Sequence, residues 1–140
     1  MRRKIIPDVI RGRRLVHLDG RATARQASKL MREHNVGAVL VMEDEVLKGI
    51  VTVNDMTYRV IAEGLDPDKA VLGEIMTPDP DSVHSDTTAI EALRLMQDGD
   101  YRHLPIVDDG RVLGLVSRRD FHGDEKARLD DETAIWERIG

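Results

Sequence analysis

Two short stretches of the sequence place a hydroxyl residue three positions before an aspartate. GIVTVNDM, residues 49–56, contains Thr52 and Asp55, and GLVSRRDF, residues 114–121, contains Ser117 and Asp120. An ionised carboxylate can accept hydrogen bonds from both hydroxyls of a ribose, and a hydroxyl residue can donate to a phosphate oxygen. Helix capping is the alternative, because aspartate also satisfies the N–H groups of a first helical turn. The two pairs therefore indicate either nucleotide contacts or two capped helices.

The two stretches belong to one sequence module that occurs twice. Asp120 follows Asp55 by 65 positions, and Gly114 follows Gly49 by the same distance. The offset continues without a gap over residues 7–121. It also matches Ile10 with Ile75, Thr23 with Thr88, Ala24 with Ala89, Ala27 with Ala92, Leu30 with Leu95, Met31 with Met96, Asp44 with Asp109 and Val51 with Val116. So many identities in one register indicate an internal duplication, and we refer to copy one and copy two.

Each copy predicts a helix, two strands and a second helix. Thr23 with Gln26, and Thr88 with Glu91, have the spacing of capping boxes, and alanine and methionine residues recur behind them at helical spacing. Strands are expected over residues 36–42, 50–53, 101–107 and 115–117, with turns over 43–49 and 108–114.

Several single residues refine this prediction. Asp55 is expected to open the second helix of copy one, and Asp66-Pro67 to restart the chain in a short capped turn. Pro105 is expected at an edge or bulge of its strand, because proline cannot donate to a ladder. Gly49 and Gly114 are expected to serve the turn into the second strand.

The predicted fold is a mixed α/β (α+β) fold of two repeats. Each repeat would be a small sheet packed on helices, and a pseudo-twofold axis would relate them. The predicted boundaries are 5–65 for the first repeat, 66–71 for a linker, 72–123 for the second repeat and 124–140 for a helical tail.

Composition narrows the classes of function. The formal net charge is -5 and there is no cysteine, so nucleic-acid binding, disulfides and cysteine-ligated metals are not expected. No apolar run is long enough to span a membrane, and we expect a cytoplasmic protein. The five histidines lack metal-site spacing and no nucleophile has an identifiable base, so we expect neither an enzyme nor a required cofactor.

Both ends of the chain leave alternatives open. The basic residues of the N-terminal arm could be solvated or could contact phosphate or a partner; they are Arg2, Arg3, Lys4, Arg11, Arg13 and Arg14. The tail, with apolar Ala134, Ile135, Trp136 and Ile139, could cover an edge of the fold, join a dimer interface or dock on a partner.

Taken together, these stretches resemble the CBS-domain family, specifically a free-standing tandem pair or Bateman module. The resemblance rests on the two repeated phrases, on IMTPDP at residues 75–80 and on YRHLPIVDDGRVLGLVS at residues 101–117. It implies a regulatory protein that binds an adenosine-containing ligand between its repeats, with AMP first and ADP, ATP, NAD or S-adenosylmethionine as alternatives. It also implies a homodimer and an effector protein that the sequence does not identify.

The resemblance also implies candidate contact residues. In copy two, basic residues just before the Leu-Pro of the strand would face phosphate, with surface solvation as their alternative role. The copy-two candidates are Thr77, Pro78, Asp79 and Pro80 on the adenine side, and Arg102, His103, Pro105, Ser117, Arg118, Arg119 and Asp120. The copy-one candidates are Leu15, Val16, Gly37, Ala38, Thr52, Asn54 and Asp55. Copy one has no basic residue at the positions of Arg102 and His103, so a weaker or empty site is expected there.

Two other functions stay open at this point. The chain could be a ligand-independent interaction or dimerisation module that uses its helices and Trp136. Less favoured is nucleic-acid binding through the basic arm, which high salt would weaken.

Overall fold

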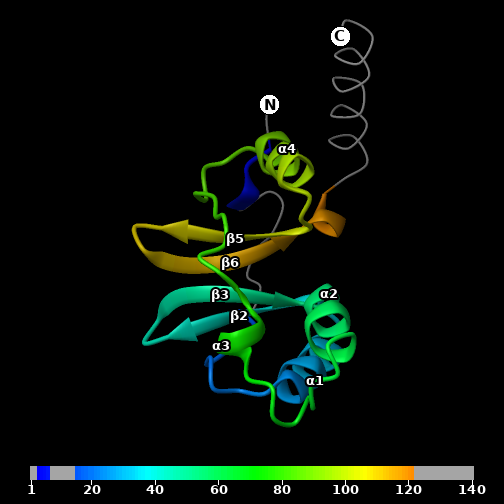
Figure 1. Ribbon diagram of the computed structural model, residues 1–140. Coiled ribbons are helices and arrows are strands. Elements are labelled where there is room, and N and C mark those ends of the chain that lie inside the picture. The colour runs from blue at the N-terminus through cyan, green and yellow to red at the C-terminus, as the bar shows by residue number, and fades with distance from the viewer. Residues whose placement is uncertain (1–2, 7–14, 122–140) are drawn as a thin grey trace, which may run out of the picture. The chain divides into compact units, whose positions relative to one another are not determined.

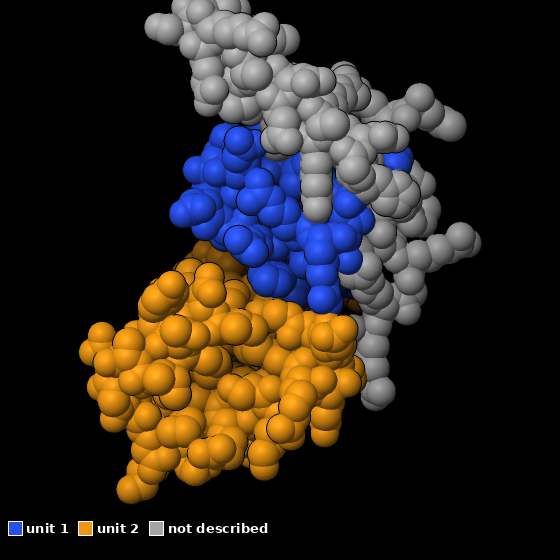
Figure 2. Space-filling view, turned by 90° about the vertical axis from the view of Figure 1, so that its right-hand side faces the viewer, with its two compact units in different colours: residues 1–13, 82–109, 113–140 blue, residues 14–81, 110–112 orange. Residues whose placement is uncertain are grey.

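The computed structural model describes residues 3–6 and 15–121 and divides the chain into two compact units (Figure 2). Of the described residues, unit 2 holds 15–81 and 110–112, and unit 1 holds 3–6, 82–109 and 113–121. Each unit has a hydrophobic core of its own. Copy one thus lies mainly in unit 2, and copy two mainly in unit 1.

Unit 2 is built on a four-stranded sheet with the strand order β1-β2-β3-β4. Figure 1 shows its two long strands, β2 and β3. β1 runs parallel to β2, and the other neighbours are antiparallel. The elements are β1 (His17–Leu18), α1 (Ala24–His34), β2 (Ala38–Glu43), β3 (Val46–Thr52), α2 (Val53–Asp55), the π-helix η2 (Met56–Ile61), α3 (Leu72–Ile75) and β4 (Thr77–Pro78).

Unit 1 repeats the central part of this arrangement with a two-stranded sheet. Its elements are α4 (Ala89–Gly99), β5 (His103–Asp108), β6 (Arg111–Ser117) and the 3-10 helix η3 (Arg118–Asp120). Pro105 lies in β5, at the edge of this two-stranded sheet, as predicted. The mixed α/β fold is confirmed.

Both predicted capping boxes are present. The Thr23 hydroxyl accepts from the Gln26 N–H at the start of α1, and the Gln26 side chain accepts from the Thr23 N–H. Thr88 and Glu91 form the same reciprocal pair at the start of α4. These bonds satisfy N–H groups that a first helical turn leaves without partners, which explains why both helices begin where the sequence predicts.

The two hairpins turn through two residues, so the longer turns predicted over 43–49 and 108–114 were wrong. φ is 49° at Asp44 and 65° at Glu45 in one hairpin, and 50° at Asp109 and 77° at Gly110 in the other. Two consecutive positive φ angles are the signature of a type I′ turn, whose twist suits a tight hairpin. The polar residues that follow each turn belong to the strands, and they made those segments resemble loops.

The helix after β3 begins earlier than predicted. Thr52 caps it and Val53 is its first residue, so Val53 is not part of the strand. Asp55 is the third residue of this helix instead of the residue that opens it. The hydroxyl residue of the repeated phrase is therefore the cap, and the aspartate is its partner one turn further on.

The cores consist almost entirely of aliphatic side chains. In unit 2, Ala24, Ala27 and Met31 of α1 are buried against Val39 and Val51. In unit 1, α4 contributes the equivalent apolar face, made of Ala89, Ala92, Leu93 and Met96. Small alanines on the inner face let each helix lie close to its sheet, in agreement with the predicted core positions.

The segments that open the two predicted repeats cross over. Ile5, the first residue of the predicted first repeat, is fully buried in unit 1, and its N–H donates to the Thr87 carbonyl at 2.9 Å. Leu72, the first residue of the predicted second repeat, is fully buried in unit 2, and its N–H donates to the Ala22 carbonyl at 2.9 Å. The core of each repeat is therefore completed by the segment that opens the other repeat.

The crossing segments follow a different offset from the rest of the repeat. The donors Ile5 and Leu72 are 67 positions apart, whereas the acceptors Ala22 and Thr87 are 65 apart. A second pair of bonds shows the same difference: Ala89 N–H to the Arg3 carbonyl and Ala24 N–H to the Ala70 carbonyl, both 2.8 Å. The offset of 65 read from the sequence thus does not extend to these segments.

Some predictions fall on parts of the chain outside the described residues. They are the basic residues Arg2, Arg11, Arg13 and Arg14, the match of Ile10 with Ile75, and the C-terminal tail with Trp136.

Candidate functional site

In copy one, Thr52 and Asp55 bond to each other across the end of β3. The Thr52 N–H donates to Asp55 Oδ2 at 2.8 Å, and the Asp55 N–H donates to Thr52 Oγ1 at 3.3 Å. Because Thr52 Oγ1 acts as an acceptor in this pair, its own proton stays available for a further acceptor. The pair is a capping box, so the capping role considered from the sequence is present.

In copy two, Ser117 and Asp120 are held in a similar way at the end of β6. The Ser117 N–H donates to Asp120 Oδ2 at 2.7 Å, and the Ser117 hydroxyl donates to the same oxygen at 3.2 Å. A serine hydroxyl carries one proton. In this arrangement Ser117 donates that proton to Asp120 and therefore does not donate it to a phosphate oxygen. A carboxylate has about four acceptor positions, so capping and ligand contact do not exclude each other.

In copy two, the open end of the hairpin, away from its turn, places His103 beside Ser117 and Asp120. In copy one, Ala38 pairs with Thr52, and the Val53 N–H donates to the Gly37 carbonyl at 3.0 Å. Copy two repeats the latter bond 65 positions later, from the Arg118 N–H to the Arg102 carbonyl at 2.8 Å. The residue opposite Ser117 is therefore His103. Directly opposed residues of antiparallel strands share one face of the sheet.

The surroundings of His103 favour its neutral form. Burial lowers the pKa of this partly buried imidazole, and the positive charges of Arg119 and Arg102 lower it further, while Asp120 opposes them. Arg102, Arg119 and Asp120 are thus close enough to His103 to act on its charge. The structure brings these four predicted residues together around the end of β6, in unit 1.

Copy one has a different set of side chains at the equivalent place. Gly37 and Ala38 stand where copy two has Arg102 and His103. Asp55 has instead an arginine from its own helix: Arg59 Nε lies 3.5 Å from Asp55 Oδ1. The sequence prediction did not include Arg59, although its position four residues after Asp55 could have indicated a helical ion pair.

The predicted adenine-side residues before copy two lie on the sheet of unit 2. Thr77 and Pro78 form β4 and pair with Ile50 and Gly49 of β3, and the Asp79 N–H donates to the Lys48 carbonyl at 3.1 Å. These residues therefore belong to the same unit as Asp55. Among the corresponding residues of copy one, Leu15 and Val16 are half-buried, and the Val16 carbonyl accepts from the Leu40 N–H.

Gly49 and Gly114 lie inside β3 and β6, so the prediction that they serve the turns was wrong. A Cβ at Gly49 would collide with Met76 Sδ and lie 2.8 Å from the Thr77 carbonyl oxygen. The close approach of β4 is thus the reason for glycine here. The sequence could not show this contact because its partners lie in another element.

The remaining predicted residues divide by exposure. Asn54 and Arg118 are exposed, and Pro80 is half-buried. Pro105 is buried and its carbonyl accepts from the Val83 N–H at 3.0 Å, which ties β5 to the segment before α4.

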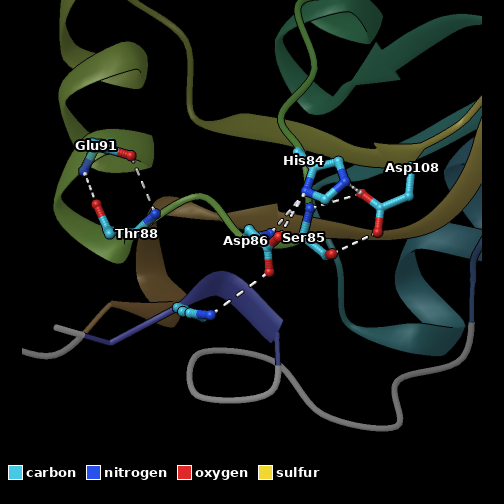
Figure 3. Close-up of polar contacts among 7 residues, drawn as sticks. His84, Ser85, Asp86, Thr88, Glu91 and Asp108 are labelled. Carbon is cyan, nitrogen blue, oxygen red and sulfur yellow. Dashed lines mark hydrogen bonds and ion pairs between the residues drawn. The ribbon is translucent and has the colours of Figure 1, made fainter. Parts of the chain in front are cut away.

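A polar network that the sequence did not predict fixes that segment (Figure 3). Asp108 contacts both Ser85 and His84. It accepts a hydrogen bond from the Ser85 hydroxyl at 2.5 Å, and its Oδ1 lies 3.1 Å from His84 Nε2. The bonds from Ser85 lower the pKa of the Asp108 carboxyl. His84 Nδ1 also accepts from the Asp86 N–H at 3.1 Å. The network joins the end of β5 to the turn before α4.

An open cavity of about 480 Å³ lies beside this network, on unit 1. It is lined by Ser82, Val83, His84, Thr87, Glu91, Arg94, Leu95 and Asp98. None of these residues was a predicted contact. We place the candidate site at the end of β6 because the cationic groups and the carboxylate converge there.

Two classes of feature are absent from the part of the chain that the structure describes. Residues 3–6 and 15–121 contain no group of three or more histidine, cysteine or acidic side chains able to hold a metal ion. No helix in these ranges combines the length and the apolar character needed to cross a bilayer.

Comparisons with known proteins agree with the duplicated architecture. The model of the CBS domain matches residues 8–62 and 72–122. The chain is 44% identical over 95 residues to CBS domain-containing protein CBSCBSPB2 from Arabidopsis thaliana; the match covers 67% of this chain and 18% of that protein. The chain therefore corresponds to less than a fifth of that relative's length.

Solved structures show the same fold. The crystal structure of the CBS domain NE2398 superposes with a TM-score of 0.74 at 33% identity, covering 78% of this chain and 85% of that one. The CBS domain protein PAE2072 from Pyrobaculum aerophilum, solved in complex with AMP, has a TM-score of 0.75 at 24% identity, covering 85% and 93%. Two family matches along one duplicated chain establish that this protein belongs to the CBS-domain family and carries a tandem pair of CBS domains.

Proposed function

We propose that this CBS pair is a regulatory module that binds an adenosine-containing nucleotide, with AMP as the first candidate. The observation that carries the proposal is the position of His103 opposite the bonded pair Ser117 and Asp120 at the end of β6, with Arg102 and Arg119 next to them in the chain. One carboxylate among several cationic groups suits a ligand that has both hydroxyls and phosphate.

The proposed contacts follow from the chemistry of each side chain. Asp120 accepts from the ribose hydroxyls with acceptor positions beyond those that serve Ser117. Arg102 and Arg119 neutralise the phosphate, and His103 adds a positive charge when the phosphate raises its pKa. Ser117 orients Asp120 through its two bonds to Oδ2.

Binding alone does not regulate anything. The ligand must bind two shapes of the protein with different affinity, and an effector protein must distinguish those shapes. A homodimer in the cytoplasm, as expected from the sequence, is part of this proposal. The AMP complex of the Pyrobaculum aerophilum protein supports an adenine nucleotide as the ligand class.

A thermal-shift screen tests the proposal. The protein is heated with AMP, ADP, ATP, NAD and S-adenosylmethionine, and with adenosine and inorganic phosphate as partial ligands. A ligand at about 100 times its Kd adds roughly 2.7 kcal/mol to the free energy of unfolding, which raises the melting temperature visibly. We expect a shift with at least one nucleotide; no shift with any of them would contradict the proposal.

A ligand-independent assembly module is the second candidate function. η2 and the segment after it expose large apolar side chains, with Tyr58 at 66%, Ile61 at 68% and Leu65 at 44% exposure. Exposed apolar side chains that cluster favour a protein contact. A thermal-shift screen without any response, together with a dimer in analytical ultracentrifugation that Ile61→Glu dissociates, would favour this candidate.

A further inference from the structure

We propose that Arg59 blocks the carboxylate of Asp55, so that copy one does not accept the ribose of a nucleotide while Arg59 is in place. The inference rests on the proposed function, because it assigns the occupancy of the second of two equivalent positions. It makes nucleotide binding asymmetric, with one ligand per chain.

Both oxygens of Asp55 are engaged by the protein itself. Oδ2 accepts from the Thr52 N–H at 2.8 Å, and Oδ1 lies 3.5 Å from Arg59 Nε. The Asp55 side chain is only 13% exposed, whereas that of Arg59 is 46% exposed. Water therefore screens this carboxylate less than it would on an open surface.

Arg59 is fixed by further bonds at its other end. Its Nη1 donates to the carbonyl oxygens of Ile75 at 2.8 Å and of Met76 at 3.0 Å. These carbonyls lie at the C-terminal end of α3, where backbone acceptors lack helical partners. Charge-assisted bonds of this kind hold the guanidinium in place, so it stays beside Asp55 instead of moving into solvent.

A ribose that uses Oδ1 of Asp55 must compete with this arginine. The hydroxyls would have to replace a full positive charge as the partner of Oδ1, and the two carbonyls would lose their donor. Gly37 and Ala38 offer no cation that could attract the phosphate in compensation. The competition therefore favours Arg59 over the ligand.

Copy two cannot form the same contact from the equivalent position. The residue 65 positions after Arg59 is Asp124, an acidic residue that lies outside the described part of the chain. The charge at this position is thus reversed between the copies.

The test counts bound nucleotides and locates them. AMP and ATP are titrated by calorimetry into the wild-type chain and into Arg59→Gln, and amide NMR spectra follow the residues near Asp55 and near Asp120. Glutamine keeps a donor for the Ile75 carbonyl and removes the charge. Arg59→Met, which keeps the unbranched stem but no donor, is the second variant in case the first does not fold.

The matched control is Arg25→Gln. Arg25 also pairs with an aspartate in unit 2, Asp68, and both of these side chains are exposed. It should leave both the stoichiometry and the affinity unchanged, which separates a local effect of Arg59 from the general loss of one positive charge.

We expect one nucleotide per wild-type chain, with shifts near Asp120 and none at Thr52 and Asp55. Either Arg59 variant should bind a second nucleotide, because the affinity at copy one should rise about tenfold or more. The amide NMR signals of Thr52 and Asp55 should then also shift. Two nucleotides in wild type, or one in every folded Arg59 variant, would overturn the inference while leaving the proposed function intact. No binding by wild type would instead overturn the proposed function itself.

Discussion

At the scale of single residues, the two copies share one device and differ in what surrounds it. Thr52 with Asp55 and Ser117 with Asp120 each join the end of a strand to the start of a helical turn. In copy two the opposing strand brings His103 to this place, whereas copy one has Ala38 there. The same backbone geometry therefore presents different charges in the two copies.

His103 provides a pH-dependent test at this scale. Because its folded-state pKa is lowered, the folded chain resists protonation, so this histidine contributes its full stability above about pH 6.5. That contribution falls as the pH drops below this value towards the folded pKa. A bound phosphate should raise the pKa of His103, so AMP binding near pH 6 should take up protons.

An NMR titration of the His103 ring protons measures this pKa directly. Adenosine is the matched control ligand, because it carries the ribose and the base without the phosphate and should leave the pKa low. An identical His103 midpoint with and without saturating AMP would show that the phosphate does not lie near this side chain.

The sequence predicted those residues whose role depends on near neighbours. Thr52 and Asp55 bond within one helical turn, so their three-residue spacing was sufficient to indicate a helix cap. The role of Arg59 depends also on the carbonyls of Ile75 and Met76, and that of Gly49 on Met76 and Thr77. These contacts join separate elements, and no local pattern records them.

At the scale of elements, the crossing segments connect the sequence of one copy to the core of the other. The capping boxes of α1 and α4 were predictable because each is complete within four residues. Both hairpins were predicted with turns that were too long, because polar residues of the strands follow each turn. Asp44-Glu45 is not one of the sequences that mark a type I′ turn, but Asp109-Gly110 is one and could have located the second turn. The crossing could not be predicted, because the offset of 65 assigns each segment to its own copy.

Two core substitutions test the crossing. Ile5→Ala removes a fully buried side chain from unit 1, and Leu72→Ala does the same in unit 2; each should cost about 2–5 kcal/mol. Native-state hydrogen exchange shows where stability is lost. We expect Ile5→Ala to reduce protection mainly in α4 and β5, and Leu72→Ala to reduce it mainly in α1 and β2.

Each of these variants serves as the control for the other, since both shorten a buried aliphatic residue at the start of a predicted repeat. Loss of protection in α1 and β2 upon Ile5→Ala would mean that Ile5 packs within its own copy, contrary to the structure.

At the scale of the whole molecule, duplication gave the chain two related positions that have diverged. The repeated phrases were enough to predict the mixed α/β fold and the tandem CBS pair, because a constant offset survives in many residues. The composition of the two units was not predictable, because it depends on which segment completes which core. The division of roles that we propose for the copies rests on a few substitutions, among them His103 for Ala38.

The most direct test of the account is a calorimetric titration of AMP into wild type, Asp120→Ala and Asp55→Ala. Asp55→Ala is the matched control, because it removes the equivalent cap from copy one. The account predicts that Asp120→Ala weakens binding by about 1.5–3 kcal/mol, the scale of a charge-assisted hydrogen bond, while Asp55→Ala leaves the affinity unchanged. Unchanged AMP affinity in Asp120→Ala would contradict it.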